Sequence, residues 1–233
     1  MMFALGGEFS LAQFPVDNKT EFIWSHYFDY DVYLEQLQKP VKTDKAMGVF
    51  LDNYLPFHPD AINDPIIVQE EYYPLLCSFF DYIEHNYGVH IVIAAHPRSK
   101  YENHQNCFGG RPVIRGKTSQ LVRQAGFVML HSSASFAFAV LFRKPAIFVT
   151  TDRLRQGRAG QIIGTLIDFM ASTFGKSPIN LNDTFEIDWG KELMIDEEAY
   201  RNYKNKYIKK ENTEDLPLWQ VFANHLKSWK GCA

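Results

Sequence analysis

The sequence contains little cysteine and no long hydrophobic run. Its 233 residues include three widely spaced cysteines, Cys77, Cys107 and Cys232. An odd number at such spacing is typical of a reduced, cytoplasmic protein rather than a disulfide-stabilised secreted one. The longest apolar stretch, Phe136 to Phe142, is far shorter than the roughly 20 residues that cross a bilayer. Because the stretch from Met1 to Gly7 also lacks the basic and apolar regions of a signal peptide, we expect a cytoplasmic protein.

The chain also lacks a strong excess of either charge. Its formal net charge is -3, so a general electrostatic affinity for nucleic acid is not expected. Hydrophobic residues make up 46% of the chain and aromatic residues 15%, which is enough for a sizeable core. The length fits one large domain or two small ones.

The common nucleotide-binding motifs are absent. The segment FGGRPVIRGKTSQ (108–120) approaches a P-loop, but five residues separate Gly110 from Gly116, and Arg111 stands where the first glycine belongs. The strand-like residues 112–114 also lie inside the motif instead of before it. No G-x-G-x-x-G is present, so an NAD or FAD cofactor is not expected.

A metal site is not expected either. His96, His104 and Cys107 are the nearest approach to one, and their spacing fits no common zinc motif. The segment HSSAS (131–135) likewise does not match the nucleophile motif of α/β-hydrolases.

What the sequence does contain is an alternation of short apolar strands and amphipathic helices. The clearest helix runs over 72–87, where apolar residues recur with helical spacing until Gly88 ends the pattern. Strands are predicted at 46–52, 89–95, 112–114, 127–130 and 146–150, and further helices at 118–125, 133–142 and 161–172. This alternation predicts an α/β fold, a Rossmann-like parallel sheet with helices on both faces.

Three segments follow from this pattern. Residues 1–45 form an N-terminal remnant and linker, 46–185 the Rossmann-like domain, and 186–233 a C-terminal helical segment with two helices over 196–229. The first of these two helices carries a basic run, which is either a solvated face or a contact for an anionic acceptor or membrane surface. The run comprises Arg201, Lys204, Lys206, Lys209 and Lys210.

Polar residues gather where the predicted strands end. Ligands of open α/β sheets bind beyond the carboxyl ends of the strands, so these loops should face one crevice. The crevice would contain Asp52, Asn53 and His58; His96, Pro97, Arg98 and Ser99; Gly116, Lys117 and Thr118; and His131, Ser132, Ser133 and Ser135.

The chemistry of this crevice suits a phosphate. Ser132 and Ser133 are expected to open one helix, and Thr118 to cap another, where free N–H groups and the helix dipole favour an anion. His96 and Arg98 add donors and positive charge. Each feature alone has a plainer interpretation, a turn after a strand or an ordinary helix cap; their convergence favours a site.

Two segments carry a resemblance to a known family. AAHPRSKY (94–101) and VIRGKTSQLVRQAGFVMLHSSASFAFAVLFRKPAIFVTTD (113–152) resemble the donor-binding half of GT-B glycosyltransferases. Bacterial sialyltransferases, polysialyltransferases, Kdo transferases and CDP-glycerol glycerophosphotransferases show a similar His-Pro after one strand and Ser-Ser after a later one. The resemblance covers roughly residues 46–152, and it implies that His96, Pro97, Ser132 and Ser133 contact the donor's phosphate and nucleotide.

The resemblance implies a glycosyltransferase of capsular or lipopolysaccharide biosynthesis in bacteria. Its donor would be a nucleotide sugar, most simply a CMP-linked one, and its acceptor a glycan or glycolipid at the inner face of the membrane. His96 would bind and protonate the departing phosphate, with Lys117 and Arg98 offsetting charge and no metal required. Asp52 is the candidate general base, although an Asp that only caps its loop is an equal alternative.

One departure from the family leaves the function open. GT-B enzymes have two Rossmann-like domains, whereas only about 45 residues precede the donor-like domain here. The chain is then a truncated or split enzyme, or it takes the acceptor half from another subunit or a homo-oligomer. The alternative is a nucleotide- or partner-binding module without catalysis of its own. A sugar-nucleotide epimerase fits less well, because it also needs both halves and a set of carboxylates not found here.

Overall fold

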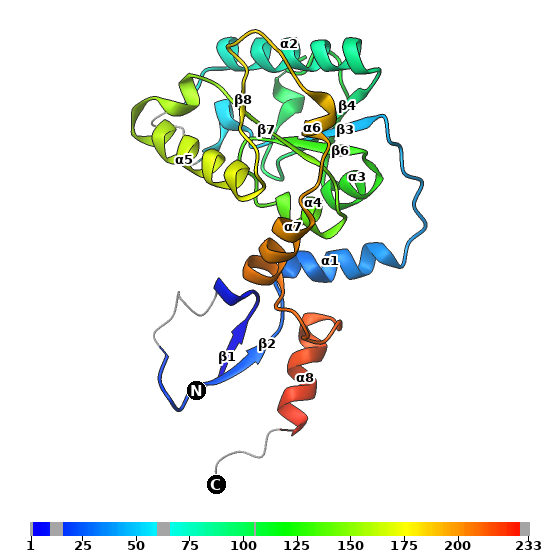
Figure 1. The fold of residues 1–233 in the computed structure, drawn as a ribbon, viewed down its shortest axis with the longest axis vertical. Coiled ribbons are helices and arrows are strands. Elements are labelled where there is room, and N and C mark those ends of the chain that lie inside the picture. Colours follow the sequence, from blue (N-terminus) through cyan, green and yellow to red (C-terminus); the bar gives the residue numbers. More distant parts are fainter. Residues whose placement is uncertain (1, 10–15, 60–65, 105, 229–233) are drawn as a thin grey trace. The chain divides into compact units, whose positions relative to one another are not determined.

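The computed structural model describes residues 2–9, 16–59, 66–104 and 106–228 (Figure 1). The chain forms two compact units. Residues Val41–Asp196 make up the sheet unit, and Met1–Pro40 together with Glu197–Ala233 make up the terminal unit. The predicted N-terminal remnant and most of the predicted C-terminal segment therefore combine into one unit. No helix of the described residues is long and apolar enough to cross a membrane.

The sheet unit is built on six strands that are all parallel. They are β3 (Met47–Leu51), β4 (His90–Ala95), β5 (Val113–Arg115), β6 (Phe127–Leu130), β7 (Ala146–Thr150) and β8 (Ile179–Asn180). Their order across the sheet is β5-β4-β3-β6-β7-β8. The chain thus builds outward from β3 in one direction, returns, and builds outward from β6 in the other. This is the doubly wound Rossmann order, and it confirms the α/β fold class.

Helices lie on both faces of this sheet (Figure 1). Helix α2 (Gln69–Tyr87) covers one face, where Phe80 meets Phe50 of β3 with ring centroids 5.4 Å apart. The other face carries α3 (Thr118–Gln124) and α4 (Phe136–Leu141), where Phe136 packs 5.6 Å from Phe148 of β7. Because successive strand residues point to opposite faces, continuous apolar strands such as β3 supply both layers of the core.

The remaining elements complete the unit. Helix α5 (Gly157–Thr173) follows β7 and contacts it, and α6 (Trp189–Glu192) is a single turn. Short 3₁₀ turns are η2 (Leu55–Phe57), η4 (Tyr101–Asn103) and η5 (Arg153–Arg155). The strand β8 and the helix α6 were not predicted, because two- and four-residue elements leave no periodic pattern.

The entry into β6 depends on a glycine. The N–H of Gly126 donates to the carbonyl of Met47 over 2.8 Å. A Cβ at this position would overlap the backbone carbonyl of Lys45. The absence of a side chain therefore lets β6 join the sheet close to the start of β3.

The terminal unit joins both ends of the chain. A parallel pair, β1 (Met2–Leu5) and β2 (Glu21–Trp24), precedes α1 (Phe28–Leu37). The C-terminal part contains α7 (Glu197–Tyr203), a π-helical turn η6 (Lys204–Ile208) and α8 (Leu218–Ser228). The two predicted helices are thus present, and the first is extended by the π-turn.

The basic run of the terminal unit is not a uniformly solvated face. The ammonium of Lys210 lies 4.1 Å from the ring centroid of Trp24. Lys209 is only 4% exposed and pairs with Asp215 over 3.2 Å. Several of these cations therefore cover aromatic rings or bond within the unit.

Candidate functional site

The loops predicted to converge do meet at the carboxyl edge of the sheet. A small cavity of about 20 Å³ lies beside the ends of β3 and β4. Its lining includes six predicted residues: Asp52, His96, Pro97, Thr118, Ser133 and Ser135. Because β3 and β6 are where the strand order reverses, this is the position at which Rossmann folds bind ligands. The enclosed volume holds about one water-sized group, so the bulk of any ligand must lie outside it.

Asp52 directly follows β3, and its carboxylate is buried. Its Oδ1 accepts the N–H of Tyr54 over 2.8 Å, and its Oδ2 accepts the N–H of His96 over 3.3 Å and the hydroxyl of Tyr101 over 2.9 Å. Burial raises the pKa of Asp52 to about 6, against the opposing effect of these three hydrogen bonds. Both oxygens already accept protein donors, so this geometry suits a positioning role better than that of a general base.

The turn after β4 presents His96. The N–H of Arg98 donates to His96 Nδ1 over 3.2 Å, and the N–H of Ser99 donates to the His96 carbonyl over 2.9 Å. With Nδ1 acting as an acceptor, the proton of the neutral imidazole lies on Nε2. The ring is half-buried and lies 5.1 Å from the ring of His58. Pro97 and Arg98 are exposed on this turn.

The β6 side differs from the prediction. Helix α4 begins at Phe136, so Ser132 and Ser133 do not open it. Instead the Ser133 carbonyl accepts the N–H of Phe136 over 3.0 Å in a tight turn, and Ser135 is the N-cap without a side-chain hydrogen bond. The prediction of a Ser-Ser helix cap is therefore wrong, because the chain turns once more before the helix starts. Ser133 and Ser135 nevertheless line the cavity.

The segment before α3 also departs from the prediction. Thr118 is the first residue of α3 and Lys117 is its N-cap, with no capping side-chain bond. Gly116 has a positive φ of 77°, which glycine adopts without strain, and it turns the chain from β5 into α3. Lys117 is exposed, and Thr118 reaches the cavity lining.

His131 lies beneath the crevice. It is 0% exposed, and its Nδ1 is 2.7 Å from the Val149 carbonyl. Since a carbonyl only accepts, Nδ1 carries the proton, and Nε2 accepts from the Tyr72 hydroxyl over 2.9 Å. Burial lowers the pKa of His131 to about 4. The ring is thus a neutral support that joins β6, β7 and α2, and both of its nitrogens are used by the protein.

Sequence reasoning placed Asn53 in the crevice without giving it a role, and it did not single out Tyr101. Asn53 donates from Nδ2 to the Ser132 carbonyl over 2.9 Å and so ties β3 to the β6 loop, while its buried Oδ1 has no partner among the described residues. The signal that placed Asn53 in the crevice was its position directly after Asp52 at the end of a predicted strand. Tyr101 gave none, because nothing in the sequence places it against a residue 49 positions away.

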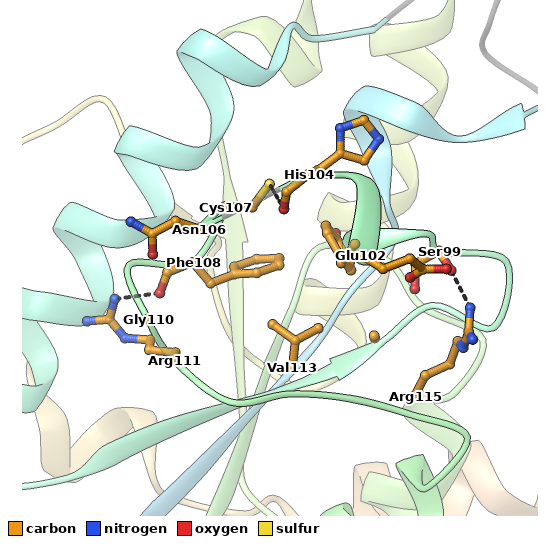
Figure 2. Close-up of a pocket in the computed structure, with 12 residues that line it drawn as sticks. Ser99, Glu102, His104, Asn106, Cys107, Phe108, Gly110, Arg111, Val113 and Arg115 are labelled. Atoms are coloured by element: carbon orange, nitrogen blue, oxygen red, sulfur yellow. Dashed lines mark hydrogen bonds between the residues drawn. The ribbon is translucent and has the colours of Figure 1, made fainter.

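A second, larger cavity has a volume of about 480 Å³ (Figure 2). It is bordered by the segment after β4 and by β5, with Tyr101 and Phe108 contributing aromatic rings. Its polar lining includes Glu102 and Arg115, and Arg115 Nη1 donates to the Ser99 carbonyl over 2.6 Å. Ala95 lines both cavities. The turn 96–99 also connects them, because His96 and Pro97 line the small cavity and Ser99 lines the large one.

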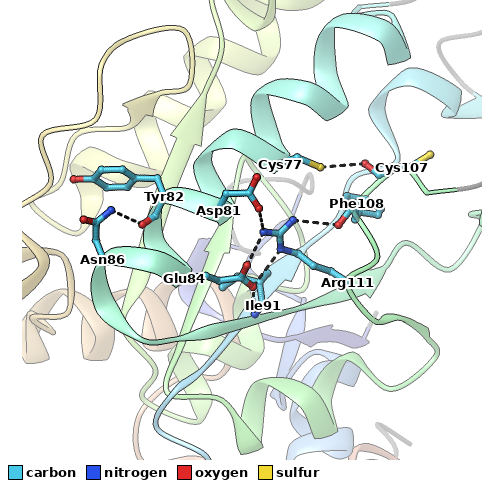
Figure 3. A network of polar contacts seen from close by, with 9 residues as sticks. All are labelled: Cys77, Asp81, Tyr82, Glu84, Asn86, Ile91, Cys107, Phe108 and Arg111. Atoms are coloured by element: carbon cyan, nitrogen blue, oxygen red, sulfur yellow. Dashed lines mark hydrogen bonds and ion pairs between the residues drawn. The ribbon is translucent and has the colours of Figure 1, made fainter.

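An ion-pair network fixes the far wall of this larger cavity (Figure 3). Arg111 Nη2 lies 2.6 Å from a carboxylate oxygen of Asp81 and 2.6 Å from one of Glu84, both on α2. Glu84 Oε1 also accepts the N–H of Ile91 over 2.9 Å. Through these contacts Arg111, two residues before β5, is joined to α2 and β4. The two carboxylates also neutralise the positive charge of Arg111.

Comparisons with known proteins assign the chain to no family. No family model matches the sequence, and no curated protein matches it. Among solved structures, it is similar to a UDP-GlcNAc 2-epimerase of Methanocaldococcus jannaschii in complex with UDP-GlcNAc and UDP, at 13% identity and a TM-score of 0.41. The alignment covers 94% of this chain and 57% of that chain. The chain therefore spans little more than half the length of that enzyme.

Proposed function

We propose that the sheet unit binds the nucleotide-activated sugar donor of a glycosyltransferase. The observation that carries the proposal is the meeting of four loops at the strand-order reversal, where polar side chains surround the Asp52–His96 contact. Rossmann sheets bind nucleotides at this position. The His-Pro and Ser-Ser segments that resemble those of cytidine-nucleotide enzymes lie on two of these loops, which makes a CMP-linked sugar the first donor to test.

In this proposal, His96 acts on the phosphate. With Nδ1 accepting from the Arg98 backbone, Nε2–H is the group that donates to a phosphate oxygen. Thr118, Ser133 and Ser135 provide further hydroxyl donors, and the exposed Lys117 and Arg98 provide positive charge as the sugar–oxygen bond breaks. Asp52 serves as a positioning residue that holds the N–H of His96, in place of the general-base role expected from the sequence.

The acceptor would be a glycan or glycolipid of capsule or lipopolysaccharide synthesis, at the cytoplasmic face of the inner membrane. The acceptor-binding half and the general base would come from a partner subunit or a second copy of the chain. No metal or other cofactor is needed if the donors around His96 carry the phosphate charge. Nucleotide binding without any transferase activity would instead favour a nucleotide- or partner-binding module.

The test is a calorimetric titration with CMP, CDP, UMP and UDP. We expect CMP or CDP to bind the native protein, and His96→Ala to weaken that binding about tenfold or more, because a charge-assisted hydrogen bond is lost. The matched control is His90→Ala, at the opposite end of the same strand β4, where the ring is exposed. Equal weakening in both variants, or no binding of any of the four nucleotides, would overturn the proposal.

A further inference from the structure

The 480 Å³ cavity is of a size and composition that a small organic ligand requires. Ligand sites occupy roughly 300–1,000 Å³ and combine apolar walls with a few placed polar groups. Here Tyr101 and Phe108 provide ring surface and Val113 an apolar wall that is 40% exposed. The polar groups are mixed in charge, with the Glu102 carboxylate and the Arg115 guanidinium both in the lining.

This mixture of charges favours an uncharged ligand with donors and acceptors. Arg111, the other cation in the lining, is neutralised by Asp81 and Glu84. The cavity therefore lacks the excess of positive charge that a phosphate would need, while Glu102 and Arg115 offer an acceptor and a donor to a polar heterocycle. Flat aromatic surface with hydrogen-bonding groups beside it is how proteins hold a nucleobase.

The position of the cavity connects it to the crevice. Ala95 lines both cavities, and the turn 96–99 has its first residues at one and its last at the other. Tyr101 links them a second time, because its ring lines the large cavity while its hydroxyl bonds to Asp52 in the small one. A ligand with an uncharged end and an anionic end could occupy both.

We propose that this cavity binds the nucleoside part, the base and ribose, of the nucleotide whose phosphate lies at His96. The proposal rests on the proposed function and adds to it the residues that recognise the base. Glu102 accepts a hydrogen bond from the base, and Arg115 donates to the base or the ribose. The side chain at position 113 limits how deeply the base can enter the cavity.

The experiment compares a ligand that has a base with one that does not. CMP and ribose 5-phosphate are titrated into the native protein, Val113→Phe and Val41→Phe. Val113→Phe narrows the cavity, whereas Val41 is equally exposed, at 41%, and does not line it. We expect Val113→Phe to weaken CMP binding about tenfold or more and to leave ribose 5-phosphate within about twofold. Val41→Phe should change neither.

A second measurement needs no substitution. Cys107 lines the cavity, so bound CMP should slow its alkylation by iodoacetamide, whereas ribose 5-phosphate should not. Peptide mass spectrometry follows Cys107 separately from the other cysteines. If Val113→Phe fails to fold, the protection of Cys107 by CMP decides whether the base lies in the cavity.

The outcomes separate this inference from the proposed function. CMP binding that is weakened in His96→Ala, but is unchanged in Val113→Phe and gives no protection of Cys107, overturns the nucleoside site and leaves the donor site standing. Absence of binding of CMP, CDP, UMP and UDP to the native protein overturns both.

Discussion

The hydroxyl of Tyr101 donates a 2.9 Å hydrogen bond to the buried carboxylate of Asp52. This contact fixes the segment after β4 to the end of β3. Because Asp52 also accepts the N–H of His96, the turn that presents His96 is held at both of its ends. Tyr73 continues it with a longer contact, 3.3 Å, between its hydroxyl and that of Tyr101. The crevice is therefore held by a polar chain that runs inward to α2.

Asp52 should make the stability of the protein depend on pH. Its pKa is raised from 3.8 to about 6, so the folded state favours the protonated acid, and this contribution is present below about pH 4 and lost as pH rises through about 6. Urea unfolding of the native protein and Asp52→Asn from pH 4 to 8 measures it. We expect the free energy of unfolding of the native protein to fall by up to about 3 kcal/mol relative to the variant. A difference that is constant with pH would contradict the raised pKa.

Tyr101→Phe should destabilise the protein most at high pH. The lost hydrogen bond stabilises the ionised form of Asp52, so we expect a cost of about 1–3 kcal/mol at pH 8 and a smaller one at pH 4, where the acid is protonated. Tyr73→Phe is the control, because its hydroxyl does not touch the carboxylate. Equal pH dependence in the two variants would mean that Tyr101 does not act through Asp52.

His131 should remain neutral through the physiological range. Burial lowers its pKa from 6.5 to about 4, so its contribution to stability, about 3 kcal/mol at most, is present above about pH 6.5 and lost as pH falls toward 4. Nitrogen NMR should show a ring protonated at Nδ1 whose shifts stay constant from pH 8 to 5. A titration midpoint near 6.5 would show that the ring is solvated and available to a ligand.

The two acids that pair with Arg111 should differ in their contributions. The Glu84 side chain is 27% exposed and also bonds to the N–H of Ile91, whereas the Asp81 side chain is 72% exposed. We expect Glu84→Gln to lower the free energy of unfolding by about 1.5–3 kcal/mol. Asp81→Asn should cost about 0–1 kcal/mol. Chemical denaturation of both variants tests this, and the reverse order would contradict the assigned geometry.

Gly126→Ala should be costly, because the new methyl group would overlap the carbonyl of Lys45, which belongs to the backbone and cannot rotate away. We expect a loss of about 1–3 kcal/mol or more in the free energy of unfolding. Gly190→Ala in α6 is the control, since its Cβ would meet only ordinary van der Waals contact, and it should be neutral or slightly stabilising. Thermal unfolding of both variants gives the comparison.

The sequence predicted the strands and long helices of the sheet unit because their signals are local. Helical spacing over α2 and the continuous apolar run of β4 identify those elements within a few residues. The same signals failed at the short connections. Helix α4 begins at Phe136 instead of at 133, and Phe136 packs on Phe148 of β7, a contact between distant residues that a local sequence pattern does not show.

For the candidate site, too, some features could be predicted from the sequence and others could not. Its residue types and their places after strands could be read along the chain, and six of them do line one cavity. Their roles could not be read. Asp52 looked equally suited to be a base or a cap, and His131 was expected in the phosphate-binding crevice, whereas both of its ring nitrogens bond within the protein.

By itself, then, the sequence determined which segments become strands and helices and that polar loops would gather at one edge of a parallel sheet. Only the tertiary structure decided which side chains face that edge and which are used beneath it. The physical reason is that burial and hydrogen-bond partners come from residues far apart in the chain. Tyr101 reaches Asp52, and Tyr72 reaches His131, only once α2 and the β4 segment have packed onto the sheet.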